Sequence, residues 1–330
     1  MHYNIPMKAF YFTRYRTYRK SLKRPLKFFL ISDLHYSNLV KNLTLRALID
    51  AAKKRQPDYI CIAGDLIDCQ EEVQVKAQRE RLLAWLSQLA KIAPVLIVPG
   101  NHDFYRKSPH FKSGLSRKNH WLSDDNPEFF GSLRQIKNVH FLHNEVYEDN
   151  RIFVLGFAPS PAYYQLDRDE EHASSLLHPG TEDKSILLRD LQNLPAELRT
   201  NLPKHKIKLA LIHSPLYLHD QEVTNLLQEF DYFISGHMHN GAVPPILNEF
   251  WKSNRGIVGP GKTMLPDHVR LRVKDPADKN IVLGAITTIQ KCAKPLSFLN
   301  AAFPVNIAEL IFDNNPAHAK DDLSLKYVSF

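Results

Sequence analysis

The sequence predicts a single-domain α/β protein. Short apolar runs that end at Ser, Gly or Pro alternate with stretches of helical periodicity. A strand–helix–strand unit of about thirty residues occurs twice in succession near the N-terminus. The chain has 330 residues, of which 44% are hydrophobic and 24% charged, and only three are cysteines. This composition predicts a large core and excludes a collagen-like chain, a disordered chain and a small disulfide-stapled domain.

Buried strands are expected at three short, nearly continuous apolar runs, residues 27–32, 59–63 and 95–98, because such runs are typical of strands covered on both faces. Further strands are expected at residues 139–142, 152–157, 208–212, 232–235, 281–288 and 306–312. Helical periodicity predicts helices over residues 43–55, 73–92, 185–194 and 220–230. Two polar stretches, 104–125 and 159–183, are interpreted as long loops inserted in a domain of residues 28–330. Loops of this length inside a compact domain tend to be functional or mobile.

Residues 1–27 carry the whole excess of positive charge, which is +8 for the chain. They contain basic and aromatic residues and no acid, whereas the rest of the chain has equal numbers of bases and acids. This mixture suits an anionic membrane surface or nucleic acid, and a helix packed on the body with a solvated basic face is the alternative. We interpret residues 1–27 as a basic aromatic arm that binds an anionic membrane peripherally.

The sequence shows none of the signals of an exported or membrane-spanning protein. No apolar run approaches the roughly 20 residues that span a bilayer, and basic residues interrupt the N-terminal segment where a secretory signal would be apolar. The three cysteines form no CxxC pair. We therefore expect a cytoplasmic protein, held at the inner face of the membrane through residues 1–27.

Polar clusters directly follow five of the predicted strands. They are Asp33 with His35, Gly64 with Asp65, the tetrapeptide Gly100-Asn101-His102-Asp103, His213, and His237 with His239. Open α/β sheets bind their ligands beyond the carboxyl ends of the strands, so these side chains are expected to meet at one rim. Carboxylates, imidazoles and an amide, without a thiolate, are typical of a divalent-metal site and not of a structural zinc site.

Each cluster by itself also has an ordinary structural explanation. Asp33 and Asp65 are typical helix N-caps, Gly100 with Asn101 is typical of a turn, and a single histidine is usually a surface or core residue. The joint pattern favours the metal site, because the GNHD tetrapeptide alone is rare by chance and four further clusters accompany it.

The five clusters resemble the calcineurin-like metallophosphoesterase superfamily, whose pattern is D-x-H, GD, GNH(D/E), H and GHxH in that order. The last motif here has Met238 and Asn240 where many members have GHTHGGQ, and with the RGI of residues 255–257 it looks most like the bacterial, membrane-associated branch. The resemblance implies a four-layer αββα sandwich. Its two mixed β-sheets would be flanked by helices, with a dinuclear metal site at the carboxyl edge of the strands.

The resemblance also implies a role for each polar residue. The first metal would be held by Asp33, His35, Asp65 and His239, and the second by Asp65, Asn101, His213 and His237. His102 would face the substrate, and Asp103 would orient its ring. The metals would be Mn, Fe, Mg or Zn, with Mn favoured.

Such a site predicts a phosphohydrolase for phosphodiester or pyrophosphate bonds, with a phosphorylated small molecule or a lipid-linked substrate. Two cations about 3.5–4 Å apart lower the pKa of a bridging water, and the resulting hydroxide attacks phosphorus in line. His102 is expected to act as general acid or phosphate binder.

Further substrate contacts are expected from Arg106, Lys107, His110 and Asn240, although solvated loop charge is the ordinary explanation for the basic residues. Two alternatives to this function stay open. One is a nuclease that uses the arm to bind nucleic acid, and the other is a non-catalytic scaffold of the same fold.

Overall fold

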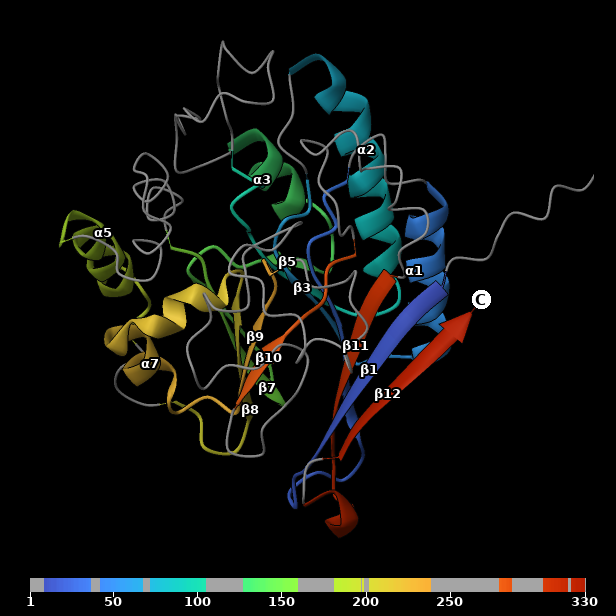
Figure 1. Cartoon of the computed structure of the whole chain (residues 1–330), viewed down its shortest axis with the longest axis vertical. Coiled ribbons are helices and arrows are strands. Elements are labelled where there is room, and N and C mark those ends of the chain that lie inside the picture. The colour runs from blue at the N-terminus through green and yellow to red at the C-terminus, as the bar shows by residue number, and fades with distance from the viewer. Residues whose placement is uncertain are drawn as a thin grey trace, which may run out of the picture.

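Two β-sheets pack face to face, and helices cover their outer faces (Figure 1). The computed structural model describes residues 9–36, 42–67, 72–104, 127–159, 181–196, 198, 202–238, 279–286, 305–319 and 322–329. Both sheets mix parallel and antiparallel pairs. The predicted four-layer α/β class is therefore confirmed.

The larger sheet has seven strands in the order β12-β1-β11-β2-β3-β4-β5. Its strands are β1 (Ala9–Tyr18), β2 (Leu26–Ile31), β3 (Tyr59–Ala63), β4 (Val95–Val98), β5 (Val139–Phe141), β11 (Val305–Asp313) and β12 (Asp322–Ser329). Strands β2 to β5 are parallel, as are β1 and β11, whereas β12 with β1 and β11 with β2 are antiparallel.

The smaller sheet has five strands in the order β10-β9-β8-β7-β6. Its strands are β6 (Glu145–Glu148), β7 (Ile152–Phe157), β8 (Ile207–Ile212), β9 (Tyr232–Ser235) and β10 (Asn280–Val282). Strands β7 to β10 are parallel, and β6 is antiparallel to β7. Parallel strands end at the same edge of their sheet. The loops after β2, β3 and β4 therefore leave the larger sheet at one edge, and those after β8 and β9 leave the smaller sheet at one edge.

Helices lie on opposite sides of the sandwich, with α1 and α2 on one side and α5 and α7 on the other (Figure 1). The helices are α1 (Asn42–Arg55), α2 (Glu72–Leu89), α3 (Pro127–Arg134), α5 (Thr181–Gln192) and α7 (Gln221–Leu227), with 3₁₀ helices η2 (Pro215–His219) and η7 (Pro316–Ala319). Residues 181–183 were predicted as the end of a loop, but they form the first turn of α5, which begins at Thr181.

Three apolar clusters fill the spaces between the layers. Strand β2 shows how the sequence sorts them: Phe29 packs towards the helices of the larger sheet, and Phe28 packs between the sheets. Successive side chains of a strand point to opposite faces, so an apolar run serves two clusters at once. Trp85 of α2 belongs to the helix-side cluster and donates its indole N–H to the carbonyl of Leu45 at 2.9 Å.

Residues 9–18 differ from the expectation of an arm or a surface helix. They form β1, which hydrogen-bonds to β11 on one side and β12 on the other. Phe12 is buried on the helix side and Tyr15 between the sheets. The guanidinium of Arg14 lies 2.8 Å from Glu309, so the charge is paired within the sheet. Phe, Tyr and Thr favour strands, and this propensity outweighs the charge pattern here.

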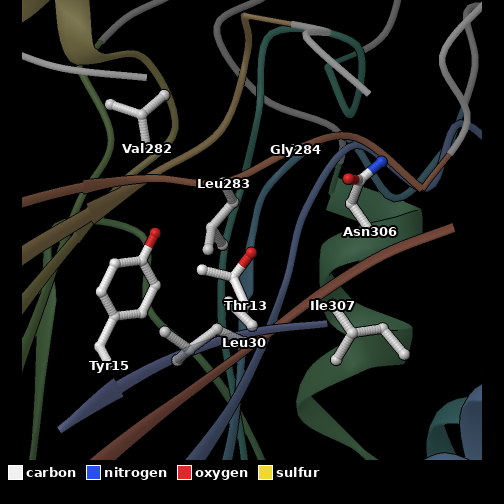
Figure 2. Close-up of a pocket in the computed structure, with 9 residues that line it drawn as sticks. Thr13, Tyr15, Leu30, Val282, Leu283, Gly284, Asn306 and Ile307 are labelled. Carbon is white, nitrogen blue, oxygen red and sulfur yellow. The ribbon is translucent and has the colours of Figure 1, made fainter. Parts of the chain in front are cut away.

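A small cavity lies between the sheets, where β1, β11 and the segment after β10 meet (Figure 2). Thr13, Tyr15 and Asn306 contribute polar atoms to its lining, and Leu30 and Leu283 contribute apolar ones. Its volume of about 10 Å³ is the space of roughly one water molecule. The sheets therefore pack closely at this point, and the cavity is too small for a phosphoester.

No helix in the described ranges is both long and apolar enough to cross a membrane.

Candidate metal centre

Six of the seven predicted metal ligands have described positions, and they follow the carboxyl ends of five strands. Asp33 and His35 come after β2, Asp65 after β3, Asn101 after β4, His213 after β8 and His237 after β9. Donor atoms of His35, Asp65 and His102 lie within 4.8 Å of one another, and so do those of Asp65, His213 and His237. Asp65 thus belongs to two potential metal-binding groups, one on each side of it.

The two carboxylate oxygens of Asp65 have different surroundings. Oδ1 accepts the backbone N–H of His102 at 2.8 Å. Oδ2 accepts no hydrogen bond from the described residues, although it lies 3.4 Å from Nε2 of His35 and 3.2 Å from Nε2 of His213. A buried carboxylate oxygen that faces two imidazole nitrogens is a donor arranged for cations.

Four imidazoles surround Asp65 as two edge-to-face pairs. The rings of His35 and His102 have centroids 4.7 Å apart at 89°, and those of His213 and His237 are 5.1 Å apart at 75°. His35, His102 and His213 are buried, and His237 is half-buried. Imidazole nitrogens together with a shared carboxylate suit borderline divalent metals such as Mn, Fe and Zn.

The imidazole of His213 has an oxygen neighbour at each nitrogen. Nδ1 lies 2.7 Å from the carbonyl oxygen of Ala63, to which it donates, and Nε2 lies 3.0 Å from Oδ1 of Asn101. A ring that gives its Nδ1 proton to a carbonyl offers the lone pair of Nε2 to a metal. The amide of Asn101 and the ring of His213 therefore face the same point from two different sheets.

Asp33 connects the first and last motifs. Its two carboxylate oxygens accept the backbone N–H of His237 at 3.1 and 3.0 Å, and Oδ1 lies 3.9 Å from Nε2 of His35. Gly236 permits this approach, because a Cβ at that position would collide with Oδ2 of Asp33 and Oγ of Ser32. The glycine before His237 is thus required by packing against the first motif.

Four of the predicted ligands have left-handed backbone conformations. The φ angles are 53° for Asp33, 43° for His35, 54° for Asp65 and 68° for His237. Non-glycine residues pay about 1–3 kcal/mol for rarely populated backbone conformations, which cluster at functional sites. Sequence reasoning did not predict this strain, because the motif fixes residue types and not dihedral angles.

Asp103 connects two of the loops at the site. Its carboxylate accepts the N–H of Gly100 at 2.8 Å and that of Ile67 at 3.0 Å, and the side chain is fully buried. These bonds tie the loop after β4 to the loop after β3, on which Asp65 lies. The expected role of Asp103, to orient the ring of His102, stays a prediction.

The buried charges of this cluster shift one another's protonation. Burial alone would raise the pKa of Asp65, but the imidazoles of His213, His102 and His35 hold it well below its ordinary value. Burial lowers the pKa of His213, and the carboxylates of Asp65 and Asp33 more than reverse this and raise it to about 9. Burial, followed by the charge of Asp65, raises the pKa of Asp103 to about 7.

The described donors fit a pair of divalent cations. The buried Oδ2 of Asp65 faces one imidazole from each side, and the proton of His213 on Nδ1 leaves Nε2 for a metal. In the metal-free protein, the neighbouring imidazoles supply the positive charge that keeps Asp65 ionised. Bound cations would supply this charge in their place. Five further predicted residues, His239, Asn240, Arg106, Lys107 and His110, lie outside the described residues.

Comparison with known proteins decides the family. The model of the calcineurin-like phosphoesterase family matches residues 26–241. The chain belongs to this family. Its matched domain is therefore that of a phosphoesterase, a metal-dependent hydrolase with candidate metal ligands in place.

The relatives compared below have low sequence identity to this chain. An uncharacterized metallophosphoesterase of Campylobacter jejuni is 22% identical over 229 residues, which are 69% of this chain and 47% of that protein. The chain thus spans about half the length of this relative. A dimetal phosphatase from Danio rerio has a TM-score of 0.43 at 16% identity, over 80% of this chain and 88% of that one. A protein from Thermus thermophilus has a TM-score of 0.37 at 13% identity, over 64% of this chain and 82% of that one.

Proposed function

We propose that this protein hydrolyses a phosphodiester or pyrophosphate bond with two divalent cations bound on either side of Asp65. The observation that carries this proposal is that two groups of metal-binding side chains share Asp65. A single structural metal needs one closed set of ligands. A carboxylate shared between two sets is the arrangement of a two-metal hydrolase.

The ligands are divided between the cations as in the family pattern, which places Asp33 in the first set, whereas the geometric group there is His35, Asp65 and His102. Asp33, His35 and Asp65 serve the first cation, together with His239, and Asp65, Asn101, His213 and His237 serve the second. The nearness of Nε2 of His213 to Asp65 and Asn101 supports the second set. Manganese is the metal we favour, since oxygen and imidazole donors suit it.

Bound cations supply Lewis-acid polarisation of the phosphoryl group and a more acidic water. The chain's own contribution is to hold its donors rigidly. Backbone hydrogen bonds fix Asp33 and Asp65, and the carbonyl of Ala63 fixes His213. The proposed role of His102 is to bind a phosphoryl oxygen or to give a proton to the departing oxygen, and the position of its ring against His35 at the same rim supports this.

The substrate is proposed to be a phosphorylated small molecule or a lipid-linked phosphate. The membrane contact expected of residues 1–27 stays a prediction. The exposed bases Lys20, Lys23 and Arg24 lie in the turn before β2, whereas the metal centre follows its carboxyl end. Six extended residues span about 20 Å, so a membrane bound at this turn would lie at the pole opposite the centre. Any membrane contact that delivers substrate is therefore expected to use other residues.

Hydrolysis of bis(p-nitrophenyl) phosphate and of a nucleoside diphosphate sugar, each with Mn²⁺, tests the proposal. We expect turnover that chelation abolishes and Mn²⁺ restores. His237→Ala should lower kcat by at least about 100-fold, and the exposed His205→Ala should leave it unchanged. Turnover that survives both chelation and His237→Ala would refute the proposal. Stoichiometric metal binding without turnover on either substrate would favour the scaffold alternative.

A further inference from the structure

Ser32 lies beneath the metal centre, at the point where three strands end. It follows β2 directly and is fully buried. Its hydroxyl donates to the carbonyl oxygen of Ala63, the last residue of β3, at 2.8 Å. On its other side lies Gly236, which follows β9 and whose Cβ, if present, would collide with Oγ of Ser32. The hydroxyl is thus wedged between the ends of β3 and β9.

The carbonyl that accepts this hydroxyl is the one that fixes His213. Nδ1 of His213 lies 2.7 Å from the same oxygen of Ala63. A carbonyl oxygen has two lone pairs, so it can accept both donors. Ser32 and His213 are 181 positions apart in the sequence, and both contact the carbonyl oxygen of Ala63.

We propose that Ser32 is a positioning residue that holds the carbonyl of Ala63 in the orientation that accepts Nδ1–H of His213. This inference rests on the proposed function, in which His213 binds the second cation through Nε2. Metal-binding histidines commonly give their other ring proton to a carbonyl or carboxylate, and loss of such a partner typically weakens metal binding 10- to 100-fold, roughly.

The position of Gly64 explains why the carbonyl needs a second contact. The peptide that follows Ala63 leads into Gly64, whose φ is 82°, and its Cβ, if present, would lie 2.5 Å from Nδ1 of His213. Glycine is therefore required here, and it resists rotation of the peptide plane less than other residues do. The hydroxyl of Ser32 supplies the constraint that a side chain at position 64 cannot.

Ser32→Ala removes the hydroxyl without adding bulk, and Ser214→Ala is the matched control. Ser214 is also buried and follows His213, but its hydroxyl accepts the N–H of Leu216 in η2. Calorimetric titration of the metal-free full-length chain with Mn²⁺ should show about 10- to 100-fold weaker binding for Ser32→Ala and no change for Ser214→Ala. Equal losses in both variants would overturn the inference.

The ring proton of His213 gives a second measurement that needs neither metal nor turnover. In ¹⁵N-labelled metal-free protein, Nδ1–H should be protected from solvent exchange, and Ser32→Ala should speed its exchange about two- to tenfold, the effect of one lost hydrogen bond. Ser32→Cys keeps a weak donor in a somewhat larger side chain and should fall between the two, which covers failure of Ser32→Ala to fold. An unchanged ring proton and unchanged Mn²⁺ affinity would overturn the role of Ser32. Absence of hydrolysis in the wild type, with this proton still sensitive to Ser32, would instead contradict only the proposed function.

Discussion

The backbone N–H of His102 donates to Oδ1 of Asp65 at 2.8 Å, and this bond turns Oδ2 towards the imidazoles of His35 and His213. Asp65→Asn keeps an oxygen that can accept the N–H of His102 but removes the negative charge between the imidazoles. We expect the variant to fold, to retain less than one equivalent of metal per chain, and to have a kcat at least about 100-fold below that of the wild type. Elemental analysis after desalting measures retention, with the exposed Asp50→Asn as control. Full metal content in Asp65→Asn would contradict the shared-ligand role.

His102 belongs geometrically to a metal-binding group, yet we assign it to the substrate. His102→Ala should therefore lower kcat by about 100- to 10,000-fold, the usual contribution of a general acid, while both cations stay bound. Metal analysis alongside kinetics separates the two roles. Loss of a cation in this variant would make His102 a ligand.

Gly236→Ala and Gly131→Ala make the same chemical change with opposite expected results. A Cβ at position 236 collides with Ser32 and Asp33, whereas one at position 131, in α3, meets nothing within 4 Å. Gly236→Ala should unfold more easily and bind Mn²⁺ more weakly. Gly131→Ala should gain about 0.5–1 kcal/mol of unfolding free energy, because alanine favours a helix. Urea unfolding and Mn²⁺ titration measure both effects. Unaltered Mn²⁺ binding in Gly236→Ala would contradict the packing argument.

The carboxylate of Asp149 accepts a hydrogen bond from the hydroxyl of Tyr59, and we expect this contact to make the stability of the protein depend on pH. Burial raises the pKa of Asp149, but the Tyr59 hydroxyl and the N–H groups of Arg151 and Ile152 outweigh it and lower the pKa below its ordinary value. A lowered pKa in the folded state stabilises the protein above the ordinary carboxyl range, and this stabilisation is lost as pH falls through the folded-state pKa. Asp149→Asn should cost about 1 kcal/mol of unfolding free energy near neutral pH.

The measurement for Asp149 is urea unfolding at pH 7 and again at pH 3. The difference between wild type and Asp149→Asn should shrink at the lower pH, because pH 3 lies below the ordinary pKa of an aspartate, where the carboxylate's stabilisation starts to be lost. A difference that is the same at both pH values would show that the charge of Asp149 does not contribute. Tyr59→Phe, which removes the donor and keeps the ring, should show the same trend.

Apolar runs predicted the central strands closely, because burial on both faces leaves a strong signal. Strands β3, β4, β7 and β9 begin and end where the sequence predicted. The prediction was wrong for residues 9–18, where arginines alternate with aromatic residues. The acid that pairs with Arg14 is Glu309, almost 300 positions away, and sequence reasoning cannot locate such a partner.

The site shows the same division between local pattern and tertiary contact. The order of the motifs predicted that Asp65, His213 and His237 meet, since parallel strands bring their carboxyl ends together. The contact between Ser32 and the carbonyl of Ala63 was not predicted, because a serine after a strand is common and carbonyl orientation leaves no trace in the sequence. The hydrogen bonds from the backbone N–H of His237 to the carboxylate of Asp33 were not predicted either, because the two residues are far apart in the sequence.

Electron paramagnetic resonance of the protein loaded with Mn²⁺ tests the shared carboxylate most directly. Two manganese ions about 3.5–4 Å apart and bridged by Asp65 should give a spin-coupled spectrum at two equivalents per chain. Asp65→Asn should abolish the coupling. A spectrum of isolated ions at saturation in the wild type, or binding that stops at one equivalent, would contradict a dinuclear centre.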